Sequence, residues 1–429
     1  MNHFFSNKPI SSNIIILFFT LSIFFWGLEI FIFEVRFSYL LTIIFFNRFF
    51  FDKLPIIFSL FIIIHSFFLN HYLGISFNHA YFLQLIIIVL TSFTVYKNFN
   101  LILSNIKVLI FYFSIILLLL IFYDLVMNIL NRSVISLNCI FGCFSINKFI
   151  FDENSHFAIS VIPALIYLSL SKNNYINFVL ITILLLFSFF NFSTTLFVGL
   201  VLLSIIFLIF EWKKSTFKQK KNIFILLLFS ILISIVNIND DNTHKSPIVH
   251  RFHALFDLKI YAIKSLNKKD NEKKIEKVKI KNNNKTEDIN YNIDPNLPNN
   301  LSTDVVLKSL KISVLSILKY PLGVGLNNYD FAHKEFINSI KTKYPLTKTF
   351  NIQDGSNNFI KILTEFGIFS IFFAYVILKF FFQKNHSLEL KYFLLSFIFL
   401  EVFIRGAGYF NGGFLIVFLL IYLSTYKKN

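Results

Sequence analysis

Long apolar runs recur along almost the whole chain, and no other feature limits its fold so strongly. The runs measure about 17–22 residues, which is the length of a helix that crosses the hydrocarbon core of a bilayer. Only 15% of the residues are charged and 56% are hydrophobic, whereas a soluble domain has about 25% charged residues. The sequence therefore predicts an all-α polytopic membrane protein.

The apolar runs predict about twelve transmembrane helices. Two of them, 37–50 and 55–69, are short, and a re-entrant pair is the alternative for these. The other predicted spans are 13–33, 80–96, 108–127, 156–171, 176–191, 195–211, 223–238, 357–380, 391–404 and 411–425. The chain then divides into a transmembrane bundle over 1–238, a large polar loop over 239–356 and C-terminal transmembrane helices over 357–429.

The distribution of basic residues predicts the orientation of these spans. Lys and Arg collect in cytoplasmic turns, and a cytoplasmic N-terminus makes every inner turn basic, although Arg36 falls in an outer turn. The inner basic residues are Arg48, Lys53, Lys97, Lys107, Lys172, Lys213, Lys214, Lys218, Lys220, Lys221, Lys384, Lys391, Lys427 and Lys428. The same bias accounts for much of the net charge of +17 without nucleic acid as a partner. We expect an inner (cytoplasmic) membrane protein with both termini in the cytoplasm and the large loop in the periplasm.

The loop is far too long for a simple connector, at roughly 115 residues against the usual 4–6. Its middle, 267–300, is rich in Lys, Asn and Asp and predicts a solvated or disordered insertion. The flanks 248–266 and 305–318 have apolar residues at helical spacing and predict amphipathic helices on the outer face. The membrane part then holds this loop on one side of the bilayer.

Motifs for cofactors and metals are absent from the sequence. There is no phosphate-binding P-loop, no HExxH and no GxSxG, and Gly323-x-Gly325 lacks the strand and helix of a dinucleotide site. Two cysteines, Cys139 and Cys143, are too few for a metal cluster, although a local disulfide is an alternative. We expect no cofactor and no metal.

Ionisable residues in or beside spans are functional candidates, because burying them in hydrocarbon is costly. Glu153 and His156 begin the sixth span and share a helix face at this spacing; a capping acid with an interfacial histidine is the alternative. Glu365 lies about 12 Å below the outer edge. Its alternative role is a structural bridge to Lys361, four residues earlier.

Two arginines suit an anionic ligand, because the guanidinium fork binds oxyanions bidentately and keeps its charge. Arg405 precedes a glycine-rich segment that lets a substrate approach the backbone; an ion pair with Glu401 is the alternative. Arg251 is the only arginine of the large loop, and a headgroup contact is its alternative. Ser193 and Thr194 form a tight outer turn, where such residues line a ligand or simply cap a helix.

Five segments at these residues resemble the O-antigen polymerase family of bacterial polysaccharide assembly, within the wider polymerase/ligase superfamily. Phe151–Leu165 is similar to its acidic-Pro-Ser-His-Phe-Ala segment, with Asn154 in place of Pro. Pro321–Tyr329 resembles its Pro-x-Gly-x-Gly element, and Ser356–Gly367 resembles the element that opens the next span. The other two segments are Phe192–Leu196 and Ile404–Tyr409.

The resemblance implies a glycosyltransferase that joins undecaprenyl-pyrophosphate-linked oligosaccharide repeat units at the periplasmic face, without metal and with inversion. It implies pyrophosphate binding by Arg251 and Arg405, and activation of the acceptor hydroxyl by Glu153 and His156, with Glu365 as a second candidate. Residues implied to line the substrate are Ser193, Thr194, Gly323, Gly325 and Asn357. A chain-length regulator and a flippase are the implied membrane partners.

Three other functions remain open at this point. The ligase branch usually has a histidine where this chain has Ser356-Asn357-Asn358, which favours the polymerase. A non-enzymatic lipid-linked oligosaccharide flippase predicts charged residues through the midplane and a smaller outer loop. A sensor or structural membrane protein accounts for the loop but not for the buried acids and arginines.

Overall fold

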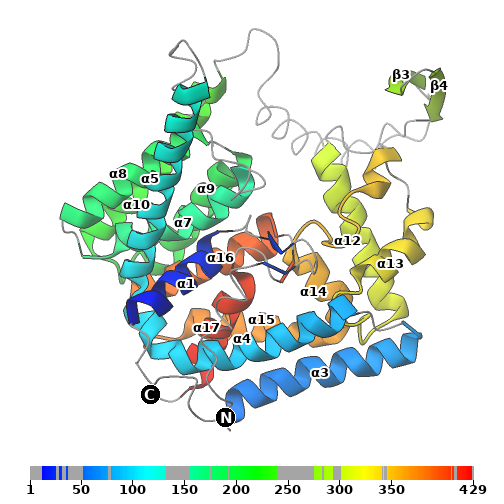
Figure 1. Ribbon diagram of the computed structural model, residues 1–429, viewed down its shortest axis with the longest axis horizontal. Coiled ribbons are helices and arrows are strands. Elements are labelled where there is room, and N and C mark those ends of the chain that lie inside the picture. The colour runs from blue at the N-terminus through cyan, green and yellow to red at the C-terminus, as the bar shows by residue number, and fades with distance from the viewer. Residues whose placement is uncertain are drawn as a thin grey trace. The chain divides into compact units, whose positions relative to one another are not determined.

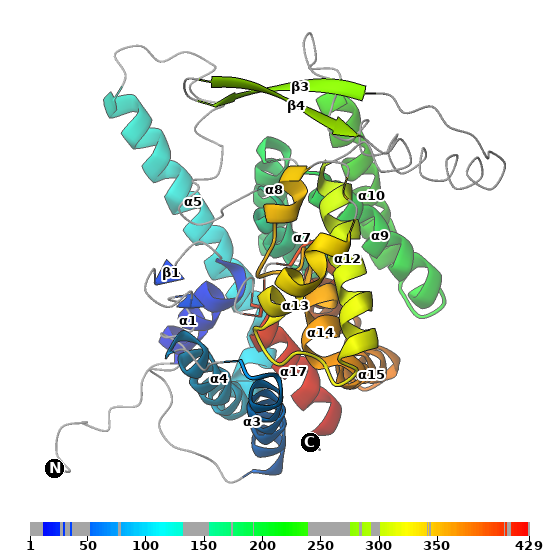
Figure 2. The same cartoon turned by 90° about the vertical axis from the view of Figure 1, so that its right-hand side faces the viewer.

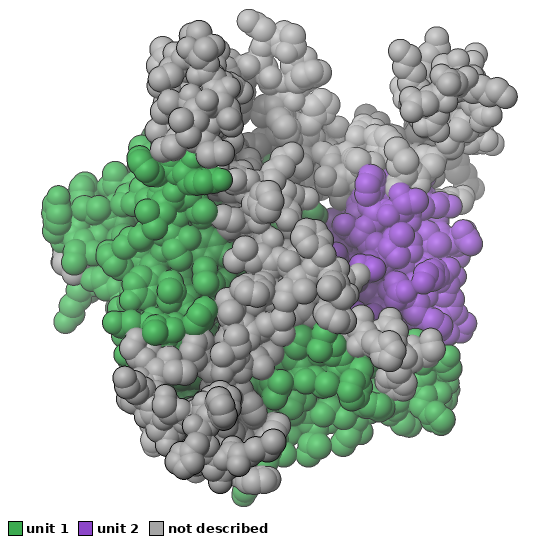
Figure 3. All heavy atoms as spheres, in the orientation of Figure 1, with its two compact units in different colours: residues 1–233, 357–359, 369–429 green, residues 234–356, 360–368 purple. Residues whose placement is uncertain are grey.

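The computed structural model is built mainly of helices (Figures 1 and 2). It describes residues 12–25, 29–30, 35–36, 52–75, 79–131, 154–172, 175–191, 193–238, 275–282, 285–292, 301–340, 342, 345–406, 408–409 and 413–427. The chain divides into two compact units (Figure 3). The first comprises Met1–Ile233, Asn357–Phe359 and Phe369–Asn429, and the second comprises Ser234–Ser356 and Ile360–Ile368.

The first unit is a bundle of apolar helices. They are α1 (Ser12–Phe24), α3 (Lys53–Leu73), α4 (His79–Ser104), α5 (Ile106–Asn131), α7 (Asn154–Leu170), α8 (Tyr175–Phe190), α9 (Thr194–Glu211), α10 (Phe217–Ile238), α15 (Ser370–Phe382), α16 (Leu388–Phe399) and α17 (Phe414–Tyr426). The helix α7 packs against α8, α9 and α16, and α17 packs against α4 and α15. The helices α7 and α17 are buried on nearly every side. Their sequences are accordingly apolar all round rather than on one face.

Four helices in the described part of the chain are long and apolar enough to cross a membrane, judged by length and composition. They are Lys53–Leu73, Tyr81–Ser104, Thr194–Glu211 and Asn358–Phe382, and five shorter apolar helices accompany them. The prediction of about twelve spans is therefore not met. One reason is that an apolar run can extend beyond the helix that it contains. In the predicted span 13–33, for example, α1 ends at Phe24. The predicted span 37–50 lies outside the described residues.

The predicted short span 55–69 is instead the 21-residue helix α3. Its start is capped by Asp52, whose side chain accepts a hydrogen bond from the backbone N–H of Leu54 at 3.2 Å. Its end is closed by Gly74 in the left-handed conformation, with φ of 66°. These caps extend the helix by two residues before and four residues after the apolar run, which makes it long enough to span a membrane.

The second unit contains the helices α12 (Leu301–Lys319) and α13 (Tyr329–Phe336), the 3₁₀ turns η1 (Ile337–Ser339) and η2 (Pro345–Thr349), and most of α14 (Asn358–Phe366). It also contains an antiparallel hairpin of β3 (Ile275–Asn282) and β4 (Lys285–Asn292), in which Lys279 is paired with Asp288. This hairpin lies where a solvated or disordered insertion was expected. The local apolar alternation at Val278 and Ile280 was masked by the surrounding lysines. The predicted helix 248–266 lies outside the described residues.

The predicted amphipathic helix over 305–318 is confirmed as α12, but its buried face is not the one that the leucines indicate. The buried face is formed by Asp304, Val305, Lys308, Ser309, Ile312, Ser313 and Ser316. Leu310 and Leu318, which belong to the apolar spacing, are 37% and 78% exposed. Serines replace leucines on the inner face because their hydroxyls bond to neighbouring chain, as the Ser313 hydroxyl does with the carbonyl of Ile360 at 3.1 Å.

The remaining elements of the structure are short. A two-stranded antiparallel ladder pairs β1 (Glu29–Ile30) with β2 (Val35–Arg36). The 3₁₀ turn η3 (Gly367–Phe369) separates α14 from α15, and the π-helical turn η4 (Leu400–Ile404) ends α16. Near the start of α16, Lys391 is buried and its Nζ lies 3.2 Å from the carboxylate of Glu211, at the end of α9. Lys391, expected in an exposed inner turn, is thus part of a buried ion pair.

Candidate functional site

The glycine-containing segment after α12 is bonded to the carboxyl end of α14 in the second unit. The N–H of Val324 donates to the carbonyl of Thr364 at 3.1 Å, and that of Gly325 donates to the carbonyl of Glu365 at 2.9 Å. The N–H of Ile368 in turn donates to the carbonyl of Pro321 at 2.8 Å. These bonds satisfy carbonyl groups that the end of a helix leaves without partners. They join the Pro321–Tyr329 and Ser356–Gly367 segments, which are far apart in sequence.

Gly323 and Gly367 are required by this close approach. A Cβ atom on Gly323 would lie 2.2 Å from the carbonyl oxygen of Glu365, and one on Gly367 would lie 2.2 Å from that of Pro321. Both glycines also have positive φ, 91° and 51°, which disfavours any residue with a Cβ. Gly323 and Gly325 are buried. The structure therefore gives Gly323 a packing role at the position expected to line a substrate.

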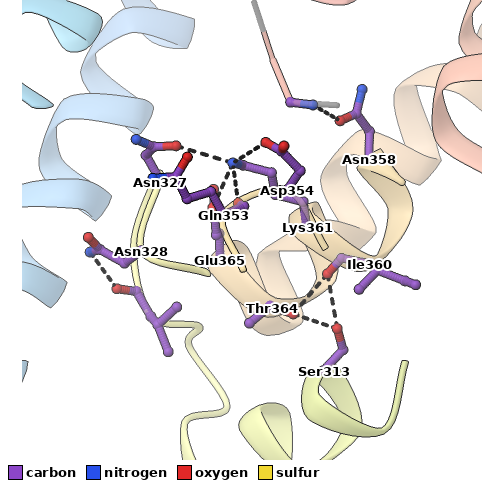
Figure 4. Close-up of polar contacts among 12 residues, drawn as sticks. Ser313, Asn327, Asn328, Gln353, Asp354, Asn358, Ile360, Lys361, Thr364 and Glu365 are labelled. Carbon is purple, nitrogen blue, oxygen red and sulfur yellow. Dashed lines mark hydrogen bonds and ion pairs between the residues drawn. The ribbon is translucent and has the colours of Figure 1, made fainter. Parts of the chain in front are cut away.

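A buried lysine, Lys361, organises the polar groups beside this junction (Figure 4). Its Nζ donates to the side-chain oxygen of Asn327 at 3.1 Å and to the carbonyl of Gln353 at 2.8 Å. The same atom lies 3.7 Å from the carboxylate of Glu365 and 4.0 Å from that of Asp354. The anticipated bridge between Lys361 and Glu365 is thus present, with Glu365 fully buried.

Two residues that bracket this cluster adopt positive φ without being glycine. Asn327 has φ of 58° and Ser356 has φ of 76°. Asn tolerates this conformation, whereas Ser adopts it rarely, and such backbone strain gathers at functional sites. Ser356 is held by hydrogen bonds of its hydroxyl with Ser309 at 3.1 Å and with the side-chain amide of Asn351 at 3.0 Å. The opening of α14 is therefore fixed by side chains rather than by local preference.

A second buried lysine lies on α12. The Nζ of Lys308 donates to the carbonyls of Thr347 at 2.9 Å and Phe350 at 2.5 Å, and lies 3.4 Å from Nε2 of His333. Burial lowers the pKa of Lys308 to about 8, although Asp304 opposes the shift. Burial and the neighbouring Lys308 lower the pKa of His333 to about 4. His333 is therefore neutral, which suits it as an acceptor from Lys308, and the cluster holds η2 on α12.

In the first unit, a buried carboxylate follows α16. Glu401 lies in the π-helical turn η4 and is fully buried. Turns of this kind are rare in proteins, and those that occur are often at functional sites. The Oε2 atom of Glu401 accepts a hydrogen bond from the side-chain amide of Asn358 at 3.3 Å. The oxygen of that amide accepts from the N–H of Gly408 at 3.0 Å (Figure 4). The other carboxylate oxygen of Glu401, Oε1, is buried and has no hydrogen-bond partner within the described residues.

The backbone beside Glu401 is equally crowded. A Cβ atom on Gly406 would lie 2.3 Å from the carbonyl oxygen of Glu401 and 2.8 Å from Cγ of Asn358. Arg405 ends η4 with extended backbone and donates its N–H to the carbonyl of Leu400 at 2.9 Å. Its side chain is half-buried. Through its two side-chain hydrogen bonds, Asn358 connects Glu401 with Gly408, which follows Arg405.

The other expected site residues are placed separately. His156 is buried on α7, and Asn357 is buried immediately before α14. Ser193 is the N-cap of α9, where its hydroxyl accepts from the N–H of Leu196 at 3.1 Å, and Thr194 is the first helical residue. Ser193 therefore has the capping role that was its alternative. Glu153 and Arg251 lie outside the described residues.

Asn358 and Lys308 were not selected from the sequence, and Glu401 was considered only as an ion-pair partner of Arg405, although all three are central to these clusters. Asn358 contacts Glu401 and Gly408, which are 43 and 50 positions away. Local sequence patterns do not predict contacts at such separations. Lys308 looked like one more solvated lysine of a basic loop. The signal that existed was the (i, i+4) spacing of Asp304 and Lys308, which places an acid and a base on one helix face.

No metal site is evident in the part of the chain that the structure describes, which holds no group of three or more His, Cys, Asp or Glu side chains suited to an ion. Comparisons with family models, with curated proteins and with solved structures give no match to this chain.

Proposed function

We propose that this chain is a polysaccharide polymerase of the O-antigen type, which joins oligosaccharide repeat units carried on undecaprenyl pyrophosphate. One observation carries the proposal. The two segments that resemble the polymerase family most fully, Pro321–Tyr329 and Ser356–Gly367, are bonded to each other, and the buried Lys361 joins Asn327 of one to Glu365 of the other. A resemblance by chance gives no reason for the two matching segments to share one polar cluster.

The reaction needs a base for the acceptor and a cation for the leaving group. The acceptor oxygen attacks the anomeric carbon, its proton passes to a base, and the bond from that carbon to the lipid pyrophosphate breaks. Arginine forks bind the departing pyrophosphate and stabilise its charge. We assign that role to Arg405 and Arg251, and keep His156 and Glu153 as candidate bases.

Glu401 joins the candidate bases, with an argument that favours it over Glu365. The carboxylate of Glu365 is already engaged in an ion pair, with the Lys361 ammonium group at 3.7 Å. Glu401 accepts from the neutral amide of Asn358 and keeps one oxygen without a hydrogen-bond partner among the described residues. Because Glu401 is fully buried, an acceptor reaches it only after the chain around it moves.

The proposal includes an inner-membrane location with cytoplasmic termini and a periplasmic second unit, together with a chain-length regulator and a flippase as membrane partners. The four helices long and apolar enough to span support a membrane location. The finer count of about twelve spans is not part of the proposal.

The test is the banding pattern of surface polysaccharide in a strain that lacks this chain. A polymerase defect leaves a single repeat unit on its final anchor in place of a ladder of lengths. Loss of even the single unit indicates a ligase or flippase instead. An unchanged ladder contradicts all three functions, provided that the same strain with the chain restored gives the wild-type pattern.

A further inference from the structure

The turn after α9 and the first turn of α10 together carry a dense cluster of positive charge. Lysine occupies five of the nine positions from 213 to 221, and these residues are Lys213, Lys214, Lys218, Lys220 and Lys221. All but Lys220, which is half-buried, are exposed. Two large aromatic side chains accompany them, Trp212 at 53% and Phe217 at 83% exposed.

Three of the five lysines lack an acidic partner among the residues that the structure describes. The acid that precedes the turn, Glu211, is buried and its carboxylate lies against Lys391 at 3.2 Å, with Lys214 at 3.4 Å. Within the described part of the chain, Lys213, Lys218 and Lys221 form no ion pair. Lys220 lies over the ring of Trp212 at 4.5 Å, so the aromatic ring and the charge act as one surface.

The turn is held in a defined shape. The backbone N–H of Thr216 donates to the side chain of Gln219 at 3.0 Å, and the N–H of Gln219 donates to the hydroxyl of Thr216 at 3.3 Å. This reciprocal capping box fixes the start of α10. The side chains of Gln219 and Asn222 also donate to carbonyls at the end of α7. The lysines are therefore presented by a hydrogen-bonded turn and by the capped start of α10.

We propose that the Trp212–Lys221 surface binds anionic phospholipid headgroups in preference to zwitterionic ones. The turn follows α9 directly, and α9 is long and apolar enough to cross a membrane, so its end lies at the level of the headgroups. Tryptophan and phenylalanine beside lysine suit that level, where the rings face the acyl boundary and the ammonium groups face phosphate. An acidic protein partner would complement the charge but would give no reason for two exposed aromatic rings at the end of a span.

The chain offers its own reporter for this binding. It contains two tryptophans, so Trp26→Phe leaves Trp212 as the single tryptophan in the full-length protein, and its emission can be excited selectively. The protein is reconstituted in vesicles of phosphatidylcholine and phosphatidylglycerol at one fixed ratio, with bromine quencher placed on either lipid in turn. We expect stronger quenching of Trp212 by the brominated anionic lipid than its mole fraction predicts, and loss of the excess at high salt.

The variant Lys213→Gln/Lys218→Gln/Lys221→Gln removes three charges and keeps the Lys214–Glu211 pair and the Lys220–Trp212 contact. We expect the preference for the anionic lipid to fall about five-fold for each lysine removed. A matched control, Lys311→Gln/Lys334→Gln/Lys348→Gln, removes the same charge elsewhere and should keep the preference. Equal quenching by the two brominated lipids, or a preference unchanged in the first triple variant, overturns the proposal. Unchanged melting of both variants in vesicles excludes misfolding as the cause of a loss.

Discussion

The ammonium group of Lys361 lies 3.7 Å from the carboxylate of Glu365, one helical turn further along α14. Both side chains are buried, and the lysine also holds Asn327 and the backbone of Gln353. The pair therefore has a structural role whether or not Glu365 takes part in catalysis. Substitutions separate a structural role from a catalytic one. Loss of the fold lowers the abundance and the melting midpoint of the protein, whereas loss of catalysis alone removes polymer and leaves both unchanged.

Lys361→Met should lower the stability of the protein by about 3–5 kcal/mol, because it leaves a buried carboxylate without its counter-charge. Glu365→Gln should cost less, since an amide oxygen can still accept from Lys361. Membrane abundance and the melting midpoint of the purified protein measure both effects. Glu365→Gln protein that is abundant yet makes no polymer would restore Glu365 as the base, against our preference for Glu401.

Gly323→Ala should destabilise the protein by about 2–5 kcal/mol, because the new Cβ meets backbone and the φ of 91° is unfavourable for alanine. Gly74→Ala is the matched control. Gly74 also has positive φ, 66°, but has nothing within 4 Å of an added Cβ, so its cost should be only about 1–2 kcal/mol. Melting midpoints of the two variants test the difference, and equal midpoints contradict the close contact at Gly323.

Arg405→Lys should fail almost as badly as Arg405→Ala if Arg405 binds the lipid pyrophosphate, because an ammonium group cannot reproduce the bidentate fork. The expected loss is roughly a hundred- to thousand-fold in rate, or about 2.7–4 kcal/mol, by analogy with oxyanion donors. Polymer length and membrane abundance are measured together. Wild-type polymer from Arg405→Lys removes Arg405 from the site and indicates that its charge alone is needed, as for a counter-charge to Glu401.

Acid should weaken the second unit through His333, whose pKa is lowered from 6.5 to about 4 in the fold. Between these two values the unfolded chain binds a proton that the folded chain does not, so stability falls as pH falls and the loss is complete near pH 4. The groups that face His333 are Lys308, Asp330 and Lys334. His333→Gln should flatten the dependence of the melting midpoint on pH across this window. A slope identical to that of the wild type assigns the effect to other groups.

The proposed orientation predicts that a reporter fused at Lys269 is active only in the periplasm and one fused at Lys218 only in the cytoplasm. The physical reason is the retention of lysine-rich turns on the cytoplasmic side. Alkaline phosphatase and a cytoplasm-active fluorescent protein report the two compartments. Cytoplasmic activity at Lys269 would contradict both the orientation and the proposed reaction at the periplasmic face.

Sequence patterns located the helices better than they located what the helices bury. The spacing of Val305 and Ile312 predicted α12, but the inward face is set by serines and Lys308, which bond to η2 and α14. Periodicity weighs residues by hydrophobicity and cannot register a polar side chain that finds its partner in a distant segment. The bridge between Lys361 and Glu365 was accessible from sequence because its partners are four residues apart on one helix.

The candidate site shows the same limit at longer range. Asn358 bonds to Glu401 and Gly408, which follow it in the chain by 43 and 50 residues, after α15 and α16. The sequence around Asn358 contains no pattern that predicts a contact with Glu401 or Gly408. The family resemblance implied that Gly323 lines the substrate, whereas its lack of a Cβ allows two backbone segments to approach each other.

The buried pair of Glu211 and Lys391 has a consequence for how the chain is made. The two residues are 180 positions apart, so at about 5–20 residues per second the ribosome needs roughly 9–36 s to add the second after the first. Throughout that interval α9 enters the membrane with a carboxylate whose long-range partner does not yet exist, and Lys214 is its nearby basic neighbour. Nascent chains arrested before residue 391 therefore carry an incompletely compensated acid at the end of α9. Membrane proteases that recognise polar groups in unfinished helices would distinguish them from the completed protein.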